Sequence, residues 1–212
     1  MQQLKKWQQS KNVQENQKKK VGLLGGTFDP IHSTHLYVAN VVRETCSLDE
    51  IWFVPAKLPP HKQDEQVSSA DERIEMVRLA IQDIAGFKLS LVEHEVEGPS
   101  YTFQTVSTLQ ESYPDHVFSF VIGADMVEYL PKWYRIEELV EMIPFIGVGR
   151  PGWSLAPEHP YRSYVSKVET VPSHISSTLI RELKGKGQSI RFLVPEAVYR
   201  YIEEKQLYGK EI

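Results

Sequence analysis

The sequence lacks several features that would mark a secreted, membrane-bound or nucleic-acid-binding protein. Its 212 residues include one cysteine, Cys46, so no disulfide can form within the chain. No segment approaches the roughly 20 apolar residues that cross a bilayer, and the first residues lack the apolar stretch of a secretory signal. The formal net charge is -4, which argues against a broad basic surface. We therefore expect a cytoplasmic protein without nucleic-acid or membrane partners.

Composition divides the chain into two parts. Residues 1–19 are rich in Gln, Lys and Asn, with Leu4, Trp7 and Val13 as their larger apolar residues. Such a composition cannot offset the entropy lost on ordering, so we expect a disordered polar extension, with docking through Trp7 as the alternative. Residues 20–212 have the usual size of one α/β domain, whose core needs no disulfide or metal.

Short apolar runs alternate with amphipathic stretches from residue 21 onward. This order is typical of an α/β protein with a doubly wound, Rossmann-like parallel sheet and helices on both faces. The apolar runs predict six strands, at residues 21–24, 51–54, 87–92, 117–122, 145–148 and 164–168.

The clearest helix is predicted at residues 70–84, where apolar residues recur at helical spacing and Ser69 with Glu72 offers a capping box. Another helix is predicted at residues 102–112, and the last one begins near Pro195. Residues 56–69 and 149–162 form long connections rich in Pro, Gly and aromatic residues. Connections of that length are commonly binding loops or lids, and a tolerated surface insertion is the alternative.

The first strand runs directly into Gly25-Gly26-Thr27-Phe28-Asp29-Pro30-Ile31-His32-Ser33-Thr34-His35, followed by an apolar helix at residues 36–42. Glycines let the backbone approach a ligand closely. Their amides and the positive end of the next helix form an anion site beyond the carboxyl end of the strand. The segment is neither a Walker loop nor G-x-G-x-x-G, which disfavours a standard dinucleotide-dependent oxidoreductase.

His32 and His35 stand three residues apart, so on the first turn of a helix both face the same side. The neighbouring glycine loop favours contact with phosphate. A structural role remains open, and so does zinc binding, although no third ligand is obvious nearby.

A second segment, Ile175-Ser176-Ser177-Thr178-Leu179-Ile180-Arg181, also favours an anion site. Hydroxyl residues that open a helix expose free amides, and an arginine in the next turn adds a bidentate donor. Read alone, the hydroxyl residues would more often be an ordinary N-cap and the arginine a solvated helix charge.

These two segments resemble the first and second motifs of the nucleotidyltransferase superfamily, so residues 20–212 are expected to form a nucleotidyltransferase domain. The resemblance implies that His32, His35 and Arg181 carry the catalytic contacts to the triphosphate of ATP. It further implies ATP-binding roles for Gly25, Gly26, Thr27, Phe28, Ser176, Ser177 and Thr178.

Further segments are similar to one branch, the bacterial nicotinate-nucleotide adenylyltransferases, and the resemblance covers residues 20–208. The matching segments are Pro59-Pro60-His61-Lys62, Gly98-Pro99-Ser100-Tyr101-Thr102-Phe103, Ile122-Gly123-Ala124-Asp125, Lys132-Trp133-Tyr134 and Gly149-Arg150-Pro151-Gly152.

By the family pattern, Asp125 holds the adenosine ribose of ATP. The mononucleotide is bound by Lys57, Thr102, Trp133, Tyr134 and Arg150, and Lys62 lies near the phosphates. Core packing is the alternative for Trp133, and a helix N-cap is the alternative for Asp125. Thr34 stands where the family usually has glycine, so its side chain narrows the approach of backbone to phosphate.

The resemblance implies transfer of the adenylyl group of ATP to nicotinate mononucleotide, with Mg²⁺ accompanying ATP and no metal ligands fixed in the protein. It leaves a homodimer open. The alternatives are an adenylyltransferase acting on nicotinamide mononucleotide or phosphopantetheine, and a nucleotide-binding regulator without turnover.

Overall fold

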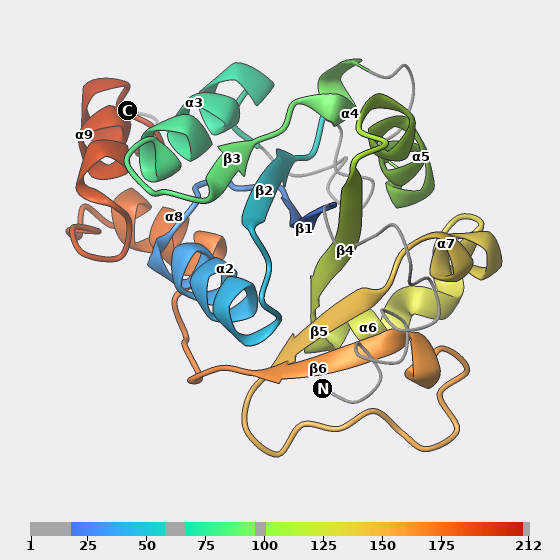
Figure 1. The fold of residues 1–212 in the computed structure, drawn as a ribbon. Coiled ribbons are helices and arrows are strands. Elements are labelled where there is room, and N and C mark those ends of the chain that lie inside the picture. The colour runs from blue at the N-terminus through green and yellow to red at the C-terminus, as the bar shows by residue number, and fades with distance from the viewer. Residues whose placement is uncertain (1–17, 58–66, 96–100, 210–212) are drawn as a thin grey trace.

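The computed structural model describes residues 18–57, 67–95 and 101–209. A parallel six-stranded sheet runs through its centre, with the strand order β3-β2-β1-β4-β5-β6 (Figure 1). The strands are β1 (Lys19–Gly26), β2 (Glu50–Pro55), β3 (Phe87–Leu89), β4 (His116–Gly123), β5 (Phe145–Gly149) and β6 (Val165–Glu169). The predicted doubly wound α/β fold is confirmed. The strand order reverses between β1 and β4, which is where such sheets bind ligands, beyond their carboxyl ends.

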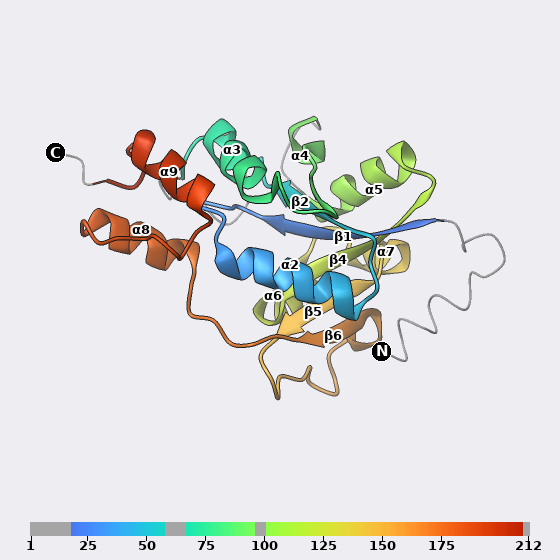
Figure 2. The same ribbon diagram turned by 60° about the vertical axis from the view of Figure 1, so that its left-hand side comes forward.

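Helices connect these strands. They are α2 (Ser33–Thr45), α3 (Ala70–Ile81), α4 (Val92–Glu95), α5 (Thr102–Ser112), α6 (Ala124–Tyr129), α7 (Ile136–Met142), α8 (Ser177–Gly185) and α9 (Glu196–Glu204), with short 3₁₀ turns at Leu130–Lys132 and Arg162–Tyr164. Figure 2 shows β1 pointing toward the end of the molecule where α8 and α9 lie. The glycine loop at the end of β1 therefore lies in the same part of the fold as the second motif, residues 175–181 at the start of α8.

Two apolar layers cover the two faces of the sheet, because successive strand side chains point to opposite faces. Leu24 and Phe53 pack with apolar residues of α2, α3, α8 and α9. Their neighbours Leu23 and Trp52 pack with residues of α5, α6 and α7. Strands covered on both faces read as continuous apolar runs, which is why these segments were recognisable in the sequence.

The start of α3 follows the predicted capping box. The amide of Glu72 donates to Ser69 Oγ at 3.3 Å, and the amide of Ser69 donates to Glu72 Oε2 at 2.8 Å. Pro195 is the N-cap of α9, whose residues Val198 and Ile202 are fully buried. The predicted helix 102–112 has the observed bounds of α5.

Several boundaries differ from the prediction. The strand expected at residues 87–92 ends at Leu89, because Val92 begins α4 and turns its apolar side chain into the core there. Helix α3 ends at Ile81 instead of residue 84. β1 begins at Lys19, inside the predicted extension, and residues 1–17 lie outside the described residues.

A charge cluster near the amino ends of the strands explains the early start of β1. Glu50 is 8% exposed and accepts hydrogen bonds from Trp52 Nε1 at 2.8 Å and Lys19 Nζ at 2.9 Å, with Lys88 Nζ at 3.1 Å. Burial opposes ionisation of Glu50, but the hydrogen bonds from Trp52, Lys19 and Lys88 outweigh it and lower its pKa to about 2. The cluster therefore ties β1 to β2 and β3 at the edge opposite the glycine loop.

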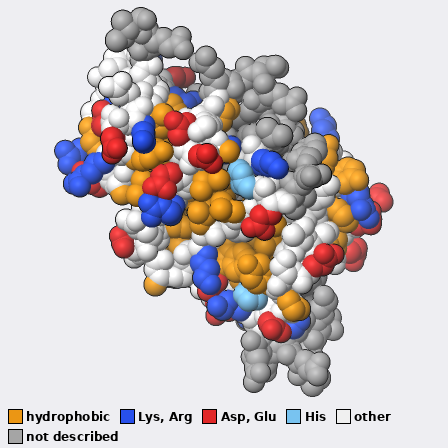
Figure 3. Space-filling model, turned by 90° about the horizontal axis from the view of Figure 1, so that it is seen from above, with side chains coloured by type: hydrophobic (Ala, Val, Ile, Leu, Met, Phe, Trp, Pro, Cys, Tyr) orange, Lys and Arg blue, Asp and Glu red, His pale blue; other side chains and the backbone are white. Residues whose placement is uncertain are grey.

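The surface is mixed in charge where it can be seen. On the face in Figure 3, acidic and basic side chains alternate around a central area of hydrophobic ones. Within the described ranges, the helices are all too short or too polar to cross a membrane.

Candidate active site

The glycine loop begins at the carboxyl end of β1, where Gly25 and Gly26 are the last two strand residues. Phe28 follows with a left-handed backbone, at φ 53°, and its ring is buried. That ring lies 5.9 Å from the Phe53 ring and 5.1 Å from the His35 ring, between centroids. The side chain of Phe28 thus belongs to the core, so the expected contact of Phe28 with ATP can come only from its backbone.

The two histidines lie together at the start of α2, as predicted. His32 is the N-cap, His35 is in the first turn, and their rings stack with centroids 3.7 Å apart and planes 21° apart. His35 Nδ1 accepts a hydrogen bond from the His32 amide at 3.2 Å. In a neutral His35 the ring proton is therefore on Nε2, which is the donor left for a ligand.

Burial sets the protonation of this pair. It lowers the pKa of His32 from 6.5 to about 4, and it lowers the pKa of His35 well below 6.5, with the nearby His32 adding to the effect. Burial therefore favours the neutral form of both rings near pH 7. His32 Nδ1 is buried and has no hydrogen-bond partner among the described residues. A buried polar atom without a partner costs free energy, so this nitrogen is a candidate contact for a bound ligand.

The second motif contacts the first one directly. Arg181 Nη1 donates to the carbonyl of Asp29 at 2.7 Å, and Ser177 Oγ donates to the carbonyl of Pro30 at 2.9 Å. These contacts join segments about 150 residues apart in the sequence. The structure therefore brings Arg181 next to the histidine loop.

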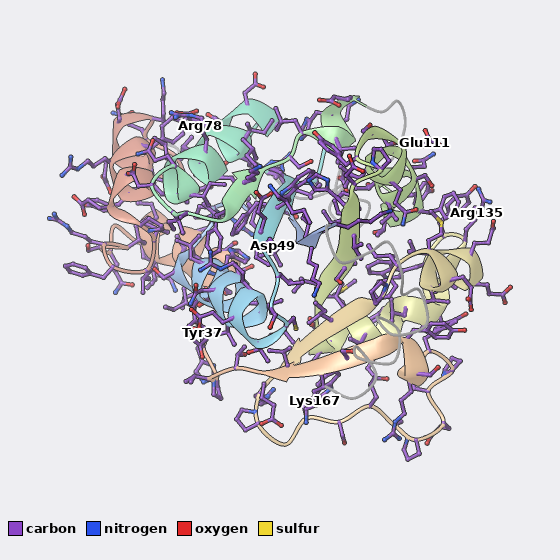
Figure 4. All side chains as sticks on the ribbon, viewed as in Figure 1. Tyr37, Asp49, Arg78, Glu111, Arg135 and Lys167 are labelled. Carbon is purple, nitrogen blue, oxygen red and sulfur yellow. The ribbon has the colours of Figure 1, made fainter. Side chains whose placement is uncertain are left out.

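Helix α2 also holds the segment that leads into α8. The hydroxyls of Thr34 and Ser173 lie 2.8 Å apart, and the amide of Val171 donates to Tyr37 Oη at 3.0 Å. Figure 4 labels Tyr37 on α2. Thr34 replaces the glycine expected at that place, and its side chain forms part of the junction between the two motifs.

At the start of α8, two of the three hydroxyl residues have structural roles. Ser176 is the N-cap, and its Oγ accepts from the amide of Leu179 at 3.2 Å. Ser177 is half-buried and bonded to Pro30, and Thr178 is exposed. Ser176 thus performs the ordinary capping role considered above.

Three other predicted residues follow the carboxyl ends of neighbouring strands. Lys57 follows β2 and is half-buried, Asp125 follows β4, and Arg150 follows β5. Asp125 and Arg150 are exposed. The Asp125 carboxylate lies so close to Gly123 that a Cβ atom added at Gly123 would be 2.5 Å from Asp125 Oδ1. All three therefore share the sheet edge with the glycine loop. Lys62 lies outside the described residues.

An aromatic group marks the expected pyridine site. Tyr134 is 50% exposed and stacks on Tyr101, with centroids 4.7 Å apart, beside Thr102 at the start of α5. The Trp133 ring is half-buried and packs edge-to-face on Phe120 and Phe145, each at 5.9 Å. Trp133 thus performs the core packing considered as its alternative role, and this packing fixes the orientation of its ring.

Next to this group, Arg135 holds the turn into α7. Its guanidinium lies 3.8 Å from the centre of the Phe103 ring and pairs with Glu138. Figure 4 labels Arg135 beside α7. The backbone of Arg135 is left-handed, at φ 52°. Tyr134 precedes this turn and also contacts the Phe103 ring edge-to-face, with centroids 6.3 Å apart.

Comparison with known proteins agrees with this geometry. Residues 23–183 match the family described as cytidylyltransferase-like. A protein named probable nicotinate-nucleotide adenylyltransferase, from Geobacillus thermodenitrificans, is 51% identical over 190 residues, which cover 90% of this chain and 86% of the relative. The nicotinate-nucleotide adenylyltransferase of Bacillus subtilis is 50% identical over 190 residues, which cover 90% and 98%. This chain belongs to the nicotinate-nucleotide adenylyltransferase family. The resemblance drawn from the sequence motifs is confirmed, and the chain is a nucleotidyltransferase.

A solved structure supports the same fold. The nicotinic acid mononucleotide adenylyltransferase of Plasmodium falciparum, solved in complex with NaAD, aligns with a TM-score of 0.73 at 21% identity. The alignment covers 90% of this chain and 97% of the other. The two proteins therefore share the same fold.

The candidate site also contains a buried arginine that was not predicted from the sequence. Arg73 is 2% exposed, and its Nη1 and Nε donate to the carbonyls of Thr27 at 2.9 Å and Ser68 at 3.1 Å. It thereby fixes the backbone of the glycine loop against the start of α3. The available signal was its spacing, because Arg73 precedes the buried Met76 and Val77 by three and four residues and so lies on the apolar face of the helix.

Proposed function

We propose that this enzyme transfers the adenylyl group of ATP to nicotinate mononucleotide, forming nicotinate adenine dinucleotide and pyrophosphate in NAD biosynthesis. The names of relatives at about 50% identity support the substrates. The observation that carries the site is the stacked histidine pair beside Arg181, with one buried imidazole nitrogen left for a ligand.

In the proposed reaction, a phosphate oxygen of the mononucleotide attacks the α-phosphorus of ATP in line, and the bond to pyrophosphate breaks. The second pKa of a phosphate monoester is about 6, so the phosphate of the mononucleotide is already ionised at neutral pH. No general base or covalent enzyme intermediate is needed. The protein must instead overcome the repulsion between two anions and stabilise the charge that develops on pyrophosphate.

The two histidines would offer uncharged N–H donors to ATP, because their rings carry no net charge before ATP binds. Burial keeps both rings neutral, so no buried positive charge has to be maintained before ATP arrives. A bound triphosphate raises the pKa of a nearby imidazole. His32 and His35 would therefore strengthen as donors when the anion is bound, while Arg181 contributes a permanent charge.

The remaining contacts follow from position along the sheet edge. The amides of the glycine loop and of the first turn of α8 would hold ATP phosphates, with Asp125 on the ribose. Arg150 and Lys57 would meet phosphates from the neighbouring strands. Thr102, Trp133 and Tyr134 would surround the pyridine ring.

Mg²⁺ would enter with ATP. No group of three or more His, Cys, Asp or Glu side chains that could hold a metal ion occurs within residues 18–57, 67–95 and 101–209. In the proposed reaction, phosphate oxygens and water would bind the ion, which would offset phosphate charge.

The test is pyrophosphate release with ATP and each of nicotinate mononucleotide, nicotinamide mononucleotide and phosphopantetheine. The groups expected around the ring are neutral, so discrimination comes from oriented donors that suit a carboxylate and oppose an amide NH₂. We expect kcat/KM to favour the acid by about 10⁴ to 10⁵. Equal use of acid and amide would overturn the ring assignment, and turnover only with phosphopantetheine would overturn the substrate class.

A tryptophan exchange tests the ring site separately. Trp133→Phe keeps the contacts with Phe120 and Phe145 and shrinks the exposed ring, so KM for the mononucleotide should rise much more than KM for ATP. Trp52→Phe is the matched control, because Trp52 packs against Tyr113 and His116 at the opposite edge. A Trp133 variant impaired mainly toward ATP would contradict the assignment.

Location and assembly belong to the same proposal. A cytoplasmic enzyme is supported by the lone cysteine and by the substrates named for the relatives. Homodimer formation is proposed as well, and sedimentation of the purified chain over a concentration series measures it.

A further inference from the structure

A tight turn follows β5 and begins at Arg150. The amide of Trp153 donates to the carbonyl of Arg150 at 3.1 Å, and Gly152 has a left-handed backbone at φ 84°. Proline followed by a left-handed glycine is the residue pattern of a type II turn, in which Pro151 and Gly152 occupy the two central positions. Arg150 therefore extends from the first residue of a well-defined turn at the carboxyl edge of the sheet.

The Trp153 ring covers the end of the strand that leads into this turn. A Cβ atom added at Gly149 would lie 2.7 Å from Cε3 of the ring, and one added at Gly147 would lie 2.9 Å from its Cη2. Both distances are too short for a real contact, so only glycine leaves room for the ring. Trp153 thus packs directly on the residue that precedes Arg150.

The neighbouring strand β6 holds the same turn. Lys167 Nζ, on the residue labelled in Figure 4, lies 6.0 Å from the centre of the Trp153 ring and 2.9 Å from Glu169 Oε1. Hydrogen bonds from Lys167 and, to a lesser extent, from the Gly152 backbone hold the pKa of Glu169 below its usual value. The turn is therefore tied to β6 at its aromatic ring and at its backbone.

We propose that Trp153 is a positioning residue for the mononucleotide, which acts by fixing the turn that carries Arg150. The side chain of Arg150 is exposed, so it is accessible to a phosphate at this edge. An arginine on a fixed backbone loses less conformational freedom on binding than one on a loose loop, and this preorganisation strengthens the contact. The inference rests on the proposed function, in which Arg150 meets the phosphate of the mononucleotide.

Steady-state kinetics of Trp153→Ala test the proposal. A weakened hydrogen bond to a charged group should raise KM for nicotinate mononucleotide by about tenfold, while KM for ATP stays within about twofold of its original value. Trp153→Phe retains a ring over Gly149 and should restore most of the loss. An unchanged KM for the mononucleotide in Trp153→Ala, or equal increases for both substrates, would overturn the inference.

A double-mutant cycle with Arg150→Ala separates positioning from a direct or purely structural role of Trp153. If Trp153 acts through Arg150, its replacement by Ala should have little further effect on KM once the guanidinium is absent. Additive effects of the two substitutions would refute the mechanism.

A pair of glycine substitutions tests the turn without disturbing the packing of the ring. Gly152 and Gly187 both have left-handed backbones, at φ 84° and 72°, and a Cβ atom at either would meet nothing within 4 Å. Alanine therefore costs similar backbone strain at both positions. Gly152→Ala should raise KM for the mononucleotide, and Gly187→Ala, after α8, should leave it unchanged.

Equal values of this KM in the two glycine variants would contradict the role of the turn, even if Trp153→Ala failed to fold. Absence of turnover in the unmodified enzyme would instead refute the proposed function, and this inference with it.

Discussion

The buried histidine pair predicts a specific loss of stability in acid. The pKa of His32 is 6.5 when unfolded and about 4 in the folded protein. Between these values the unfolded chain binds a proton that the folded protein does not. The free energy of unfolding is therefore undiminished above pH 6.5 and falls as the pH drops toward 4.

The magnitude follows from the two pKa values. Each pKa unit corresponds to about 1.4 kcal/mol, so His32 should cost about 2.5 kcal/mol of unfolding free energy at about pH 4.5. His32→Asn removes this term while keeping a residue type favoured at a helix N-cap. It also removes the part of the His35 pKa shift that comes from His32, which acts in the same direction.

Urea titrations at about pH 7.5 and pH 4.5, followed by tryptophan fluorescence, measure the difference. Between the two pH values, the free energy of unfolding should fall by about 2 to 3 kcal/mol less in His32→Asn than in the original protein. Replacing the exposed His174 by Asn is the control, and it should leave the acid loss unchanged. Equal acid losses in all three proteins would show that His32 is not buried in the neutral form.

Three further outcomes test other parts of the structure. His35→Ala should retain its fold but lose about 10² to 10³ in kcat, as expected for a preorganised donor to developing charge; near-normal turnover would refute a phosphate role. Glu50→Gln should lower the free energy of unfolding by about 1 to 3 kcal/mol near pH 7. Because the pKa of Glu50 is lowered from 4.5 to about 2 in the folded protein, this difference between the two proteins should vanish as the pH falls from 4.5 toward 2. Deleting residues 1–17 should leave melting temperature and activity nearly unchanged. Deletion through Lys19 should lower the melting temperature, because it removes the contact of Lys19 with Glu50. Equal melting temperatures of the two truncated proteins would contradict the role of that contact.

Much of the fold was predictable because its signals are local. Six apolar runs marked the six strands, and the Ser69 cap and Pro195 marked helix starts that the structure has. The errors lie where tertiary packing decides. Val92 follows a short edge strand, and only its burial against α5 and the sheet makes it the start of a helix.

The site was predictable in its chemistry and less so in its contacts. The spacing of His32 and His35 led to the correct expectation that both lie on one side of a helix start. Nothing local indicated that Phe28 belongs to the core or that Ser177 bonds to Pro30. Those outcomes depend on which segments meet after folding.

The sequence by itself determined the family, the parallel sheet and the glycine loop with its histidines, because motif spacing and apolar periodicity are properties of neighbouring residues. Only the tertiary structure decided the protonation of those histidines and the anchoring of Arg181 on Asp29. Burial sets the first, and a hydrogen bond between residues 152 apart in the sequence sets the second.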